Sequence, residues 1–367
     1  MTTVNGQQSI DMSKFYKIQN ADGKCWWMPV RGMRVGLALY QPSGWKGRML
    51  KRWLPWLHWS RLVRKALRIE KTEWVMPEEV RKVVCEAFGV REFDFAVFGG
   101  KLKDVLQVWD KKNTILGYCK ITKEKDVFDR FVYECDYLKW LDACGVTNIP
   151  KGLYVGELTN GLCVFVQDTT KKCIFKIDHF LTEKQVDFIR KMNDKTKCSC
   201  RFEDTDFAKS IDYLVGVDEL PDAHKDIVLE VKQKIVTYFS NNKVEFAAYH
   251  ADFTPWNSYV QDDELYVFDF EYSKKKYPKH LDLFHYITQI ALLEKHLSLQ
   301  GVYDFYLENK NYLLLTGIDN TDLYYVCYLM DIISFYFKIN NGKFDITDKS
   351  YVCWIGLLEI LNSKITL

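Results

Sequence analysis

The feature that most constrains the fold is a change of hydrophobic period near residue 170 of the 367-residue chain. Before that point, five short segments rich in β-branched and aromatic residues are bounded by turn-forming residues, a pattern typical of strands. They are FDFAVFGG, DVLQVWD, TILGYCKIT, GLYVGEL and LCVFVQD. Between the third and the fourth lies DVFDRFVYECDYLKWLDACGV, whose apolar residues recur near helical spacing. This order predicts a small antiparallel sheet that carries one helix.

Beyond Thr170 the pattern becomes helical. The expected helices lie near 182–192, 207–215 and 224–239, and a further set runs from about 281 to the end with interruptions near Gly317 and Gly342. A chain that is 48% hydrophobic can form more than one core. We therefore expect an α+β chain with two lobes. The expected parts are an N-terminal extension at 1–75, a β-rich lobe at 76–170 and a helical lobe at 171–367.

The predicted extension has an unusual composition. Between Gly23 and Ile69 the chain contains eleven Lys or Arg, six Trp and no Asp or Glu. Basic residues mixed with tryptophan are typical of a segment at an anionic membrane surface or beside an anionic glycan, because indole rings prefer the headgroup zone. The alternative is a solvated basic face whose aromatic side chains pack on the rest of the protein.

Overall charge and cysteine content narrow the class of protein. The formal net charge of +2 argues against a protein that binds nucleic acid by bulk charge. Eleven cysteines without a CxxC pair are expected to be reduced, as in a cytoplasmic protein. The first residues lack the apolar core of a signal peptide, and no stretch of eighteen apolar residues follows. We expect a cytoplasmic protein, with peripheral contact to the inner face of a membrane through residues 23–69.

The segment YHADFTPWNSYV, residues 249–260, places polar residues at a fixed spacing after a long amphipathic helix. His250 precedes Asp252 by two residues, and Asn257 follows Asp252 by five. The spacing matches H-x-D-x-x-x-x-N, the catalytic loop of kinases, in which the aspartate accepts the proton of the acceptor hydroxyl and the asparagine holds magnesium. The alternative is that Asp252 and Asn257 are a capping pair on a turn, and that His250 only supports the loop.

A second acidic residue, Asp269, ends the next predicted strand, LYVFD. Alternation places it on the same face as Leu265 and Val267, so that a carboxylate interrupts an apolar face. A carboxylate in such a place needs a partner, and Mg²⁺ prefers oxygen ligands. Glu271, two residues later, is interpreted as a second ligand, a substrate contact or a residue that faces solvent.

A candidate cation for phosphate binding, Lys120, lies in the third strand segment, where kinases place the lysine of V-A-I-K. The helix that follows offers Glu134 as a partner for this lysine. Glu124, at or before the start of that helix, is the alternative partner. The simpler interpretation is that Lys120 and Glu134 are surface residues.

From about residue 87 to 299 the chain resembles the aminoglycoside phosphotransferase and choline kinase superfamily. HADFTPWN is similar to the loop of that superfamily, which usually has glycine where Ala251 stands here. The segment VFDFEYSKKKYPKHLDLFHYI, residues 267–287, is similar to the metal-binding segment of choline kinases. The whole chain is also similar to sugar kinases of bacterial lipopolysaccharide and surface-polysaccharide clusters, in which an Arg- and Trp-rich stretch also precedes the kinase lobes.

The resemblance implies a bilobal protein-kinase-like fold and an ATP- and Mg²⁺-dependent transfer of the γ-phosphate to a hydroxyl group. The implied site consists of Asp252 as catalytic residue, Asn257 and Asp269 as metal ligands, Lys120, Glu134, Val166 and Asp168 as nucleotide contacts, and His250, Asp282 and Glu271 in supporting roles. The expected acceptor is a small molecule or glycan, foremost a sugar of lipopolysaccharide or surface-polysaccharide metabolism. Choline, another amino alcohol or an aminoglycoside are alternative acceptors. A nucleotide-binding pseudokinase and a membrane-associated scaffold are alternatives of another class.

Three departures from protein kinases bear on the acceptor. The first hairpin has only Gly99 and Gly100 in place of G-x-G-x-x-G, DFE replaces D-F-G at 269–271, and no A-P-E follows. Together they count against a protein substrate and favour a small-molecule kinase.

Overall fold

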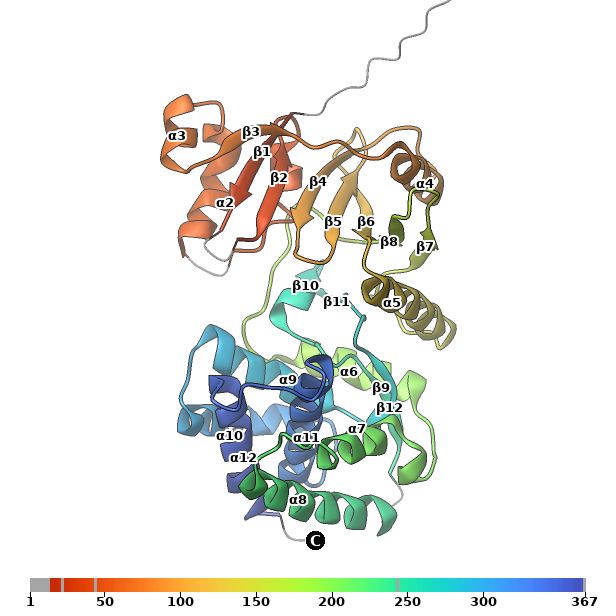
Figure 1. Ribbon diagram of the computed structural model, residues 1–367, viewed down its shortest axis with the longest axis vertical. Coiled ribbons are helices and arrows are strands. Elements are labelled where there is room, and N and C mark those ends of the chain that lie inside the picture. The colour runs from red at the N-terminus through yellow and green to blue at the C-terminus, as the bar shows by residue number, and fades with distance from the viewer. Residues whose placement is uncertain (1–13, 21–22, 43–44, 242–243, 366–367) are drawn as a thin grey trace, which may run out of the picture. The chain divides into compact units, whose positions relative to one another are not determined.

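The computed structural model describes residues 14–20, 23–42, 45–241 and 244–365. The chain divides into two compact units, of which the first comprises Met1–Asp136 and Pro150–Phe175 and the second Tyr137–Ile149 and Lys176–Leu367. The first contains an antiparallel sheet with helices, and the second is mostly helical (Figure 1). This confirms the predicted α+β class, with a β-rich N-terminal part and a helical C-terminal part.

One eight-stranded antiparallel sheet organises the first unit, in the order β3-β1-β2-β4-β5-β6-β8-β7. Its strands are β1 (Lys14–Gln19), β2 (Cys25–Pro29), β3 (Glu70–Glu73), β4 (Asp94–Gly99), β5 (Asp104–Trp109), β6 (Ile115–Thr122), β7 (Gly152–Glu157) and β8 (Cys163–Asp168). The last five are the strands that the sequence predicts. Helix α5 (Lys125–Ala143) lies between β6 and β7, as expected, and its residues from Tyr137 onward belong to the second unit.

The residues of the predicted extension join this sheet. β2 pairs with β4 through Cys25 opposite Gly99 and Trp27 opposite Val97, so that β1, β2 and β3 continue the sheet beyond β4. The expected boundary at 75/76 therefore falls inside one compact unit, because backbone pairing and a shared core cross it. The other expected boundary, at 170/171, lies close to the observed division after Phe175.

Both faces of the sheet are covered by apolar side chains, because neighbouring residues of a strand point to opposite faces. Phe15 and Phe95 lie in a core with α4 (Glu78–Phe88). Tyr16 and Ala96, each next in sequence, lie in a second core with α1 (Met33–Gly36) and α2 (Trp45–Leu57). A short helix, α3 (Arg61–Ala66), follows α2. The middle strands of the sheet therefore lie in the interior of the unit on both sides.

The second unit is built from helices and short hairpins. Its helices are α6 (Glu183–Thr196), α7 (Asp206–Val215), α8 (Asp222–Asn241), α9 (Leu281–Gln289), α10 (Leu299–Leu314), α11 (Thr321–Ile339) and α12 (Lys349–Asn362). Its strands are β9 (Phe246–Tyr249), β10 (Ser258–Gln261), β11 (Glu264–Val267) and β12 (Lys274–Pro278). β9 pairs with β12, and β10 pairs with β11. Helix α11 is buried along most of its length and forms the centre of this unit.

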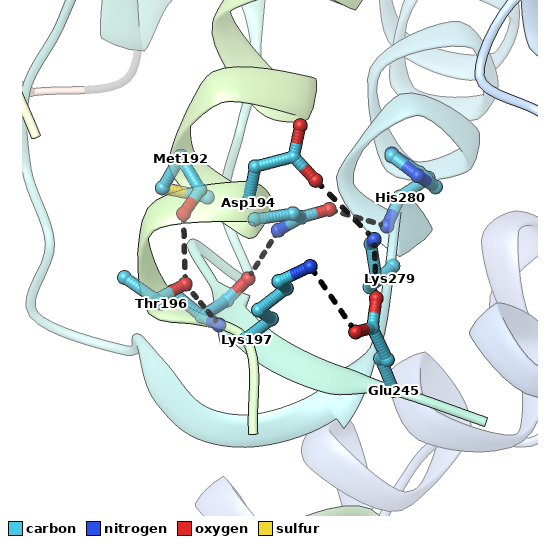
Figure 2. A network of polar contacts seen from close by, with 9 residues as sticks. Met192, Asp194, Thr196, Lys197, Glu245, Lys279 and His280 are labelled. Carbon is cyan, nitrogen blue, oxygen red and sulfur yellow. Dashed lines mark hydrogen bonds and ion pairs between the residues drawn. The ribbon is translucent and has the colours of Figure 1, made fainter. Parts of the chain in front are cut away.

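Polar contacts fasten β9 to α6 and to the start of α9. The amide of Asn193 donates to the carbonyl oxygen of Ala248 (2.8 Å), and its oxygen accepts from the backbone N–H of His280 (2.8 Å). Around this amide, Thr196 bonds to Met192, and Glu245 pairs with both Lys197 and Lys279 (Figure 2). Because β9 leads directly into the loop at 250–257, this network fixes where that loop begins.

Burial lowers the pKa of His280 from its ordinary value of 6.5 to about 4. Below pH 6.5 the unfolded chain binds a proton on this ring, whereas the folded chain does not until about pH 4, so this residue lowers stability as pH falls through that window. Because asparagine tolerates the positive φ of 69° at this position, His280→Asn should remove the effect. We expect the stability loss at pH 4 to shrink by about 3 kcal/mol.

Urea unfolding at pH 7, 5.5 and 4 measures this difference. The matched control is His296→Asn, since His296 is exposed and also has positive φ, at 52°. Equal pH dependence for the wild type and His280→Asn would contradict the prediction.

Candidate functional site

Within the first unit, Lys120 and Glu134 form a buried ion pair. The Nζ of Lys120 lies 2.7 Å from Oε2 and 3.0 Å from Oε1 of Glu134. Lys120 comes from β6 and Glu134 from α5, and the two residues are 5% and 0% exposed. Of the two glutamates considered from the sequence, Glu134 is the one that makes this pair. The lysine ammonium is thereby held in one place between the sheet and α5.

Val166 and Asp168, the expected adenine contacts, lie in β8. Val166 is fully buried and is paired with Cys119 on one side and Tyr154 on the other. The N–H of Asp168 donates to the carbonyl oxygen of Lys151 (3.0 Å), and its carboxylate accepts from the Lys151 N–H. Both residues thus take part in the sheet, and an adenine contact near them stays a prediction.

The loop after β9 belongs to the second unit and has an unusual backbone conformation. Ala251 has a φ of 67°, which is costly for a residue with a Cβ atom. Glycine, which has no Cβ atom, would adopt this conformation without that cost. Pro255 then begins a 3₁₀ turn that ends at Asn257. The turn brings Asn257 back toward Asp252.

Asp282, near the start of α9, stabilises this backbone. Its two carboxylate oxygens accept hydrogen bonds from the N–H of His250 (3.0 Å) and of Ala251 (3.1 Å). Burial raises the pKa of Asp282 to about 7, and the two N–H donors oppose that shift. A carboxylate that accepts both N–H groups holds the chain in its left-handed turn.

His250 is completely buried and supports the loop from within. Its Nδ1 accepts from the N–H of Asp252 (3.2 Å), and its Nε2 faces the carbonyl oxygen of Phe268 at 3.1 Å. Burial lowers the pKa of His250 to about 4, so the ring is neutral near pH 7. A neutral ring with Nε2 protonated makes both hydrogen bonds at once.

Asp252 and Asn257 are in direct contact. The amide Nδ2 of Asn257 donates to Oδ2 of Asp252 (2.7 Å) and to the Asp252 carbonyl oxygen (3.0 Å). The side chain of Asp252 is 34% exposed, whereas Asn257 is 6% exposed. The arrangement presents one partly exposed carboxylate on a rigid loop.

Asp269 lies beside Asn257 at the end of the β10–β11 hairpin. The N–H of Phe268 donates to the carbonyl oxygen of Asn257 (3.0 Å), which continues the pairing of Ser258 with Val267. Asp269 has a φ of 70°, so the chain turns at this residue. Glu271 follows two residues later and is half-buried.

These residues fit a hard cation. With the Nδ2 of Asn257 used as a donor, its amide oxygen is the atom that could act as a ligand, and the backbone pairing of Phe268 with Asn257 places Asp269 one residue further along. Amide and carboxylate oxygens are the ligand types that Mg²⁺ prefers.

His285, which is not among the site residues that the sequence predicts, lies beside Asp252. Its Nε2 is 3.4 Å from Oδ1 of Asp252, and the residue is 3% exposed. Among the residues that the structure describes, neither ring nitrogen has a hydrogen-bond partner. Helical spacing contained the signal, because His285 follows Asp282 by three residues on α9 and therefore lies on the same side of that helix.

Replacing one member of the buried pair tests its electrostatic role. Glu134→Leu should lower the free energy of unfolding by about 3–5 kcal/mol, because the ammonium of Lys120 loses its buried carboxylate partner. The double variant Lys120→Met/Glu134→Leu should regain most of that loss. Urea unfolding followed by circular dichroism measures both effects.

The control pair is Lys82 and Glu86 on α4, whose side chains are 75% and 67% exposed and lie 4.0 Å apart. Replacing both with alanine should change stability by less than about 1 kcal/mol. A Glu134→Leu variant as stable as the wild type would show that the buried pair does not contribute as described.

No family model and no curated protein matches the chain. Similar solved structures include aminoglycoside phosphotransferase APH(4)-Ia, with 12% identity, 79% of this chain and 99% of that chain covered, and a TM-score of 0.49. Amicoumacin kinase hAmiN in complex with AMP-PNP, Ca²⁺ and Ami has 14% identity, coverage of 79% and 96%, and a TM-score of 0.46. ADP-bound aminoglycoside phosphotransferase APH(2'')-Ib has 14% identity, coverage of 78% and 99%, and a TM-score of 0.45. Likenesses at this level do not assign an activity to the chain.

Proposed function

We propose that the chain is an ATP- and Mg²⁺-dependent kinase that transfers the γ-phosphate to a hydroxyl group of a small molecule or glycan. The observation that carries this proposal is the loop after β9. There a partly exposed Asp252 is bonded to Asn257, and the loop backbone is held by the buried Asp282. A simple capping pair would not need a buried carboxylate to stabilise a left-handed alanine.

In this proposal Asp252 accepts the proton of the acceptor hydroxyl. The hydrogen bond from Asn257 fixes Oδ2, so the carboxylate is oriented before the acceptor binds. Such orientation is the main contribution that a protein makes to phosphoryl transfer, together with neutralisation of charge. Asn257 and Asp269 would hold Mg²⁺, which when bound supplies neutralisation of phosphate charge.

Lys120 takes the role of the phosphate-binding cation. Its pairing with Glu134 removes most of the rotational freedom of a long side chain, so that little entropy is lost when a phosphate binds. Val166 and Asp168 are proposed to lie along the adenine ring.

We favour a sugar of lipopolysaccharide or surface-polysaccharide metabolism as the acceptor. Support comes from the basic, Trp-rich residues 23–69, which suit a substrate attached to an anionic membrane or glycan, with the enzyme at the cytoplasmic face of that membrane. A quaternary ammonium acceptor would need an open aromatic cage. Of the aromatic residues around the loop and the segment after it, Phe270 and Tyr277 are 0% and 2% exposed, and Tyr277 stacks on Tyr249. Trp256 and Tyr272 are half-buried. The burial of Phe270 and Tyr277 removes two walls of such a cage and favours a sugar over choline.

The metal–nucleotide site can be tested by thermal unfolding with ATP, with and without Mg²⁺. At an ATP concentration of about 100 times the dissociation constant, binding should stabilise the folded protein by about 2.7 kcal/mol in the presence of Mg²⁺. Asp269→Ala should lose the Mg²⁺-dependent part. The matched control is Asp263→Ala, since Asp263 lies on the same hairpin, is exposed and also has positive φ, at 67°. If ATP with Mg²⁺ does not raise the melting temperature of the wild type, the proposal is wrong and a scaffold is favoured.

The role of Asp252 can be tested by turnover. Asp252→Asn should lower kcat by at least about 10², the size of a general-base contribution, while the shift in melting temperature with ATP and Mg²⁺ is retained. The assay follows transfer from ATP to a panel of sugars, amino alcohols and aminoglycosides. Asp262→Asn, at an exposed residue of the β10–β11 turn, serves as the control. Equal turnover in Asp252→Asn would remove Asp252 from this role, and ATP binding without transfer to any acceptor would favour the pseudokinase alternative.

A further inference from the structure

Helices α2 and α3 and the turns that follow them expose large apolar side chains together with basic ones, a surface that we name the Trp–Arg face. Its exposed apolar residues are Trp45, Met49, Trp53, Trp56, Leu57, Trp59, Leu62 and Leu67. Its exposed basic residues are Arg48, Arg52, Arg61, Lys65 and Arg68. Trp56, Trp59 and Trp45 are 74%, 67% and 65% exposed. Contiguous exposed apolar side chains of this size mark an interaction surface.

The apolar residues follow the period of the helix. Trp45, Met49, Trp53 and Trp56 succeed one another at steps of four, four and three residues, which places them along one side of α2. Arg48 and Arg52 lie on the same side. The opposite side contributes Leu54, 1% exposed, to the core beneath the sheet. α2 thus has two apolar sides, of which only one is used in folding.

The face is held outward by specific contacts inside the first unit. The ammonium of Lys51 donates to the carbonyl oxygen of Tyr40 (2.7 Å). His58, next to Trp59, is buried edge-on against Tyr16, with ring centroids 5.6 Å apart. Arg64 donates to the carbonyl oxygens of His58 (2.5 Å) and Trp59 (2.8 Å) and lies over the ring of Tyr16. The exposed tryptophans therefore project from a fixed scaffold.

The positive charge of the Trp–Arg face indicates an anionic partner. From Gly23 to Ile69 the chain has eleven basic residues and no acidic one, so every charged side chain of the Trp–Arg face is positive. Anionic lipid headgroups attract Lys and Arg with about 1 kcal/mol per residue near the surface. Tryptophan is the side chain that prefers the headgroup zone, where its ring is apolar and its N–H remains hydrated.

We infer that the Trp–Arg face docks on the surface of an anionic lipid bilayer, with α2 and α3 lying in the plane of the headgroups. Among the residues that the structure describes, no helix is long and apolar enough to cross a membrane. Docking at the surface of a bilayer does not need a membrane-spanning helix. The inference deepens the proposed location of the enzyme, but it depends on neither ATP nor an acceptor.

Flotation with lipid vesicles tests the inference on the full chain without nucleotide. The wild type should bind vesicles of 70% phosphatidylcholine and 30% phosphatidylglycerol, and should not bind vesicles of phosphatidylcholine alone. Trp56→Ser/Trp59→Ser and Arg48→Glu/Arg52→Glu should each weaken binding at least about tenfold, because each removes interfacial or electrostatic attraction. Brominated lipids should quench tryptophan fluorescence in the wild type and less in the tryptophan variant.

Two matched variants control for general changes of the surface. Ile174→Ser removes an apolar residue of the same unit that is 76% exposed, and Arg91→Glu/Lys112→Glu reverses two exposed charges away from the face. Both should bind vesicles as the wild type does, and circular dichroism should show all variants to be folded. Failure of the wild type to bind anionic vesicles, or equal binding by the face variants, would overturn the inference. A third outcome would also overturn the inference: the wild type self-associates but does not bind vesicles, and the face variants lose that self-association. The partner of the face would then be a second copy of the chain.

Discussion

The loop after β9 depends on one buried carboxylate. Asp282 accepts the N–H groups of His250 and Ala251, and the second of these residues has a left-handed conformation that costs roughly 1–2 kcal/mol. Two hydrogen bonds of about 0.5–1.5 kcal/mol each oppose that cost and are of the same size as it. Asp282 itself is placed by the start of α9, and β9 is placed by the amide of Asn193. The position of Asp252 therefore depends on contacts among α6, β9 and α9.

Each unit holds its own candidate residues in place by internal contacts. In the first, the ammonium of Lys120 is fixed by Glu134 from α5. In the second, Asp252 and Asn257 are hydrogen-bonded to each other, and the backbone pairing of Phe268 with Asn257 places Asp269 one residue beyond Asn257's partner. In both cases a charged or polar side chain is held by an internal partner. The rigidity that the proposed phosphoryl transfer requires is thus a property of the folded chain.

The strands β4 to β8 and β11 and the helices α5 to α8 could be predicted because their patterns are strong and their ends are marked by glycine, proline, aspartate or asparagine. The strands β1 to β3 were not predicted. They are short, and segments such as CWWMP show no clear alternation, so pairing with β4 decides their structure. In the site, spacing alone predicted Asp252 and Asn257 as partners. Spacing left the choice between Glu124 and Glu134 open, because a contact between a strand and a helix is not encoded in local spacing. His285 was missed although its three-residue spacing from Asp282 on α9 places the two on the same side of that helix.

The N-terminal region cannot be removed without exposing the rest of the sheet. β2 pairs with β4, and α1 and α2 cover one side of the same sheet. Removing residues 1–69 would therefore uncover the backbone edge of β4 and one apolar side of the sheet, and an uncovered edge of this kind favours aggregation. A truncated chain would then fail for reasons unrelated to any surface that the region presents. The contribution of this region can be separated from its structural role only by changing side chains that point away from the sheet.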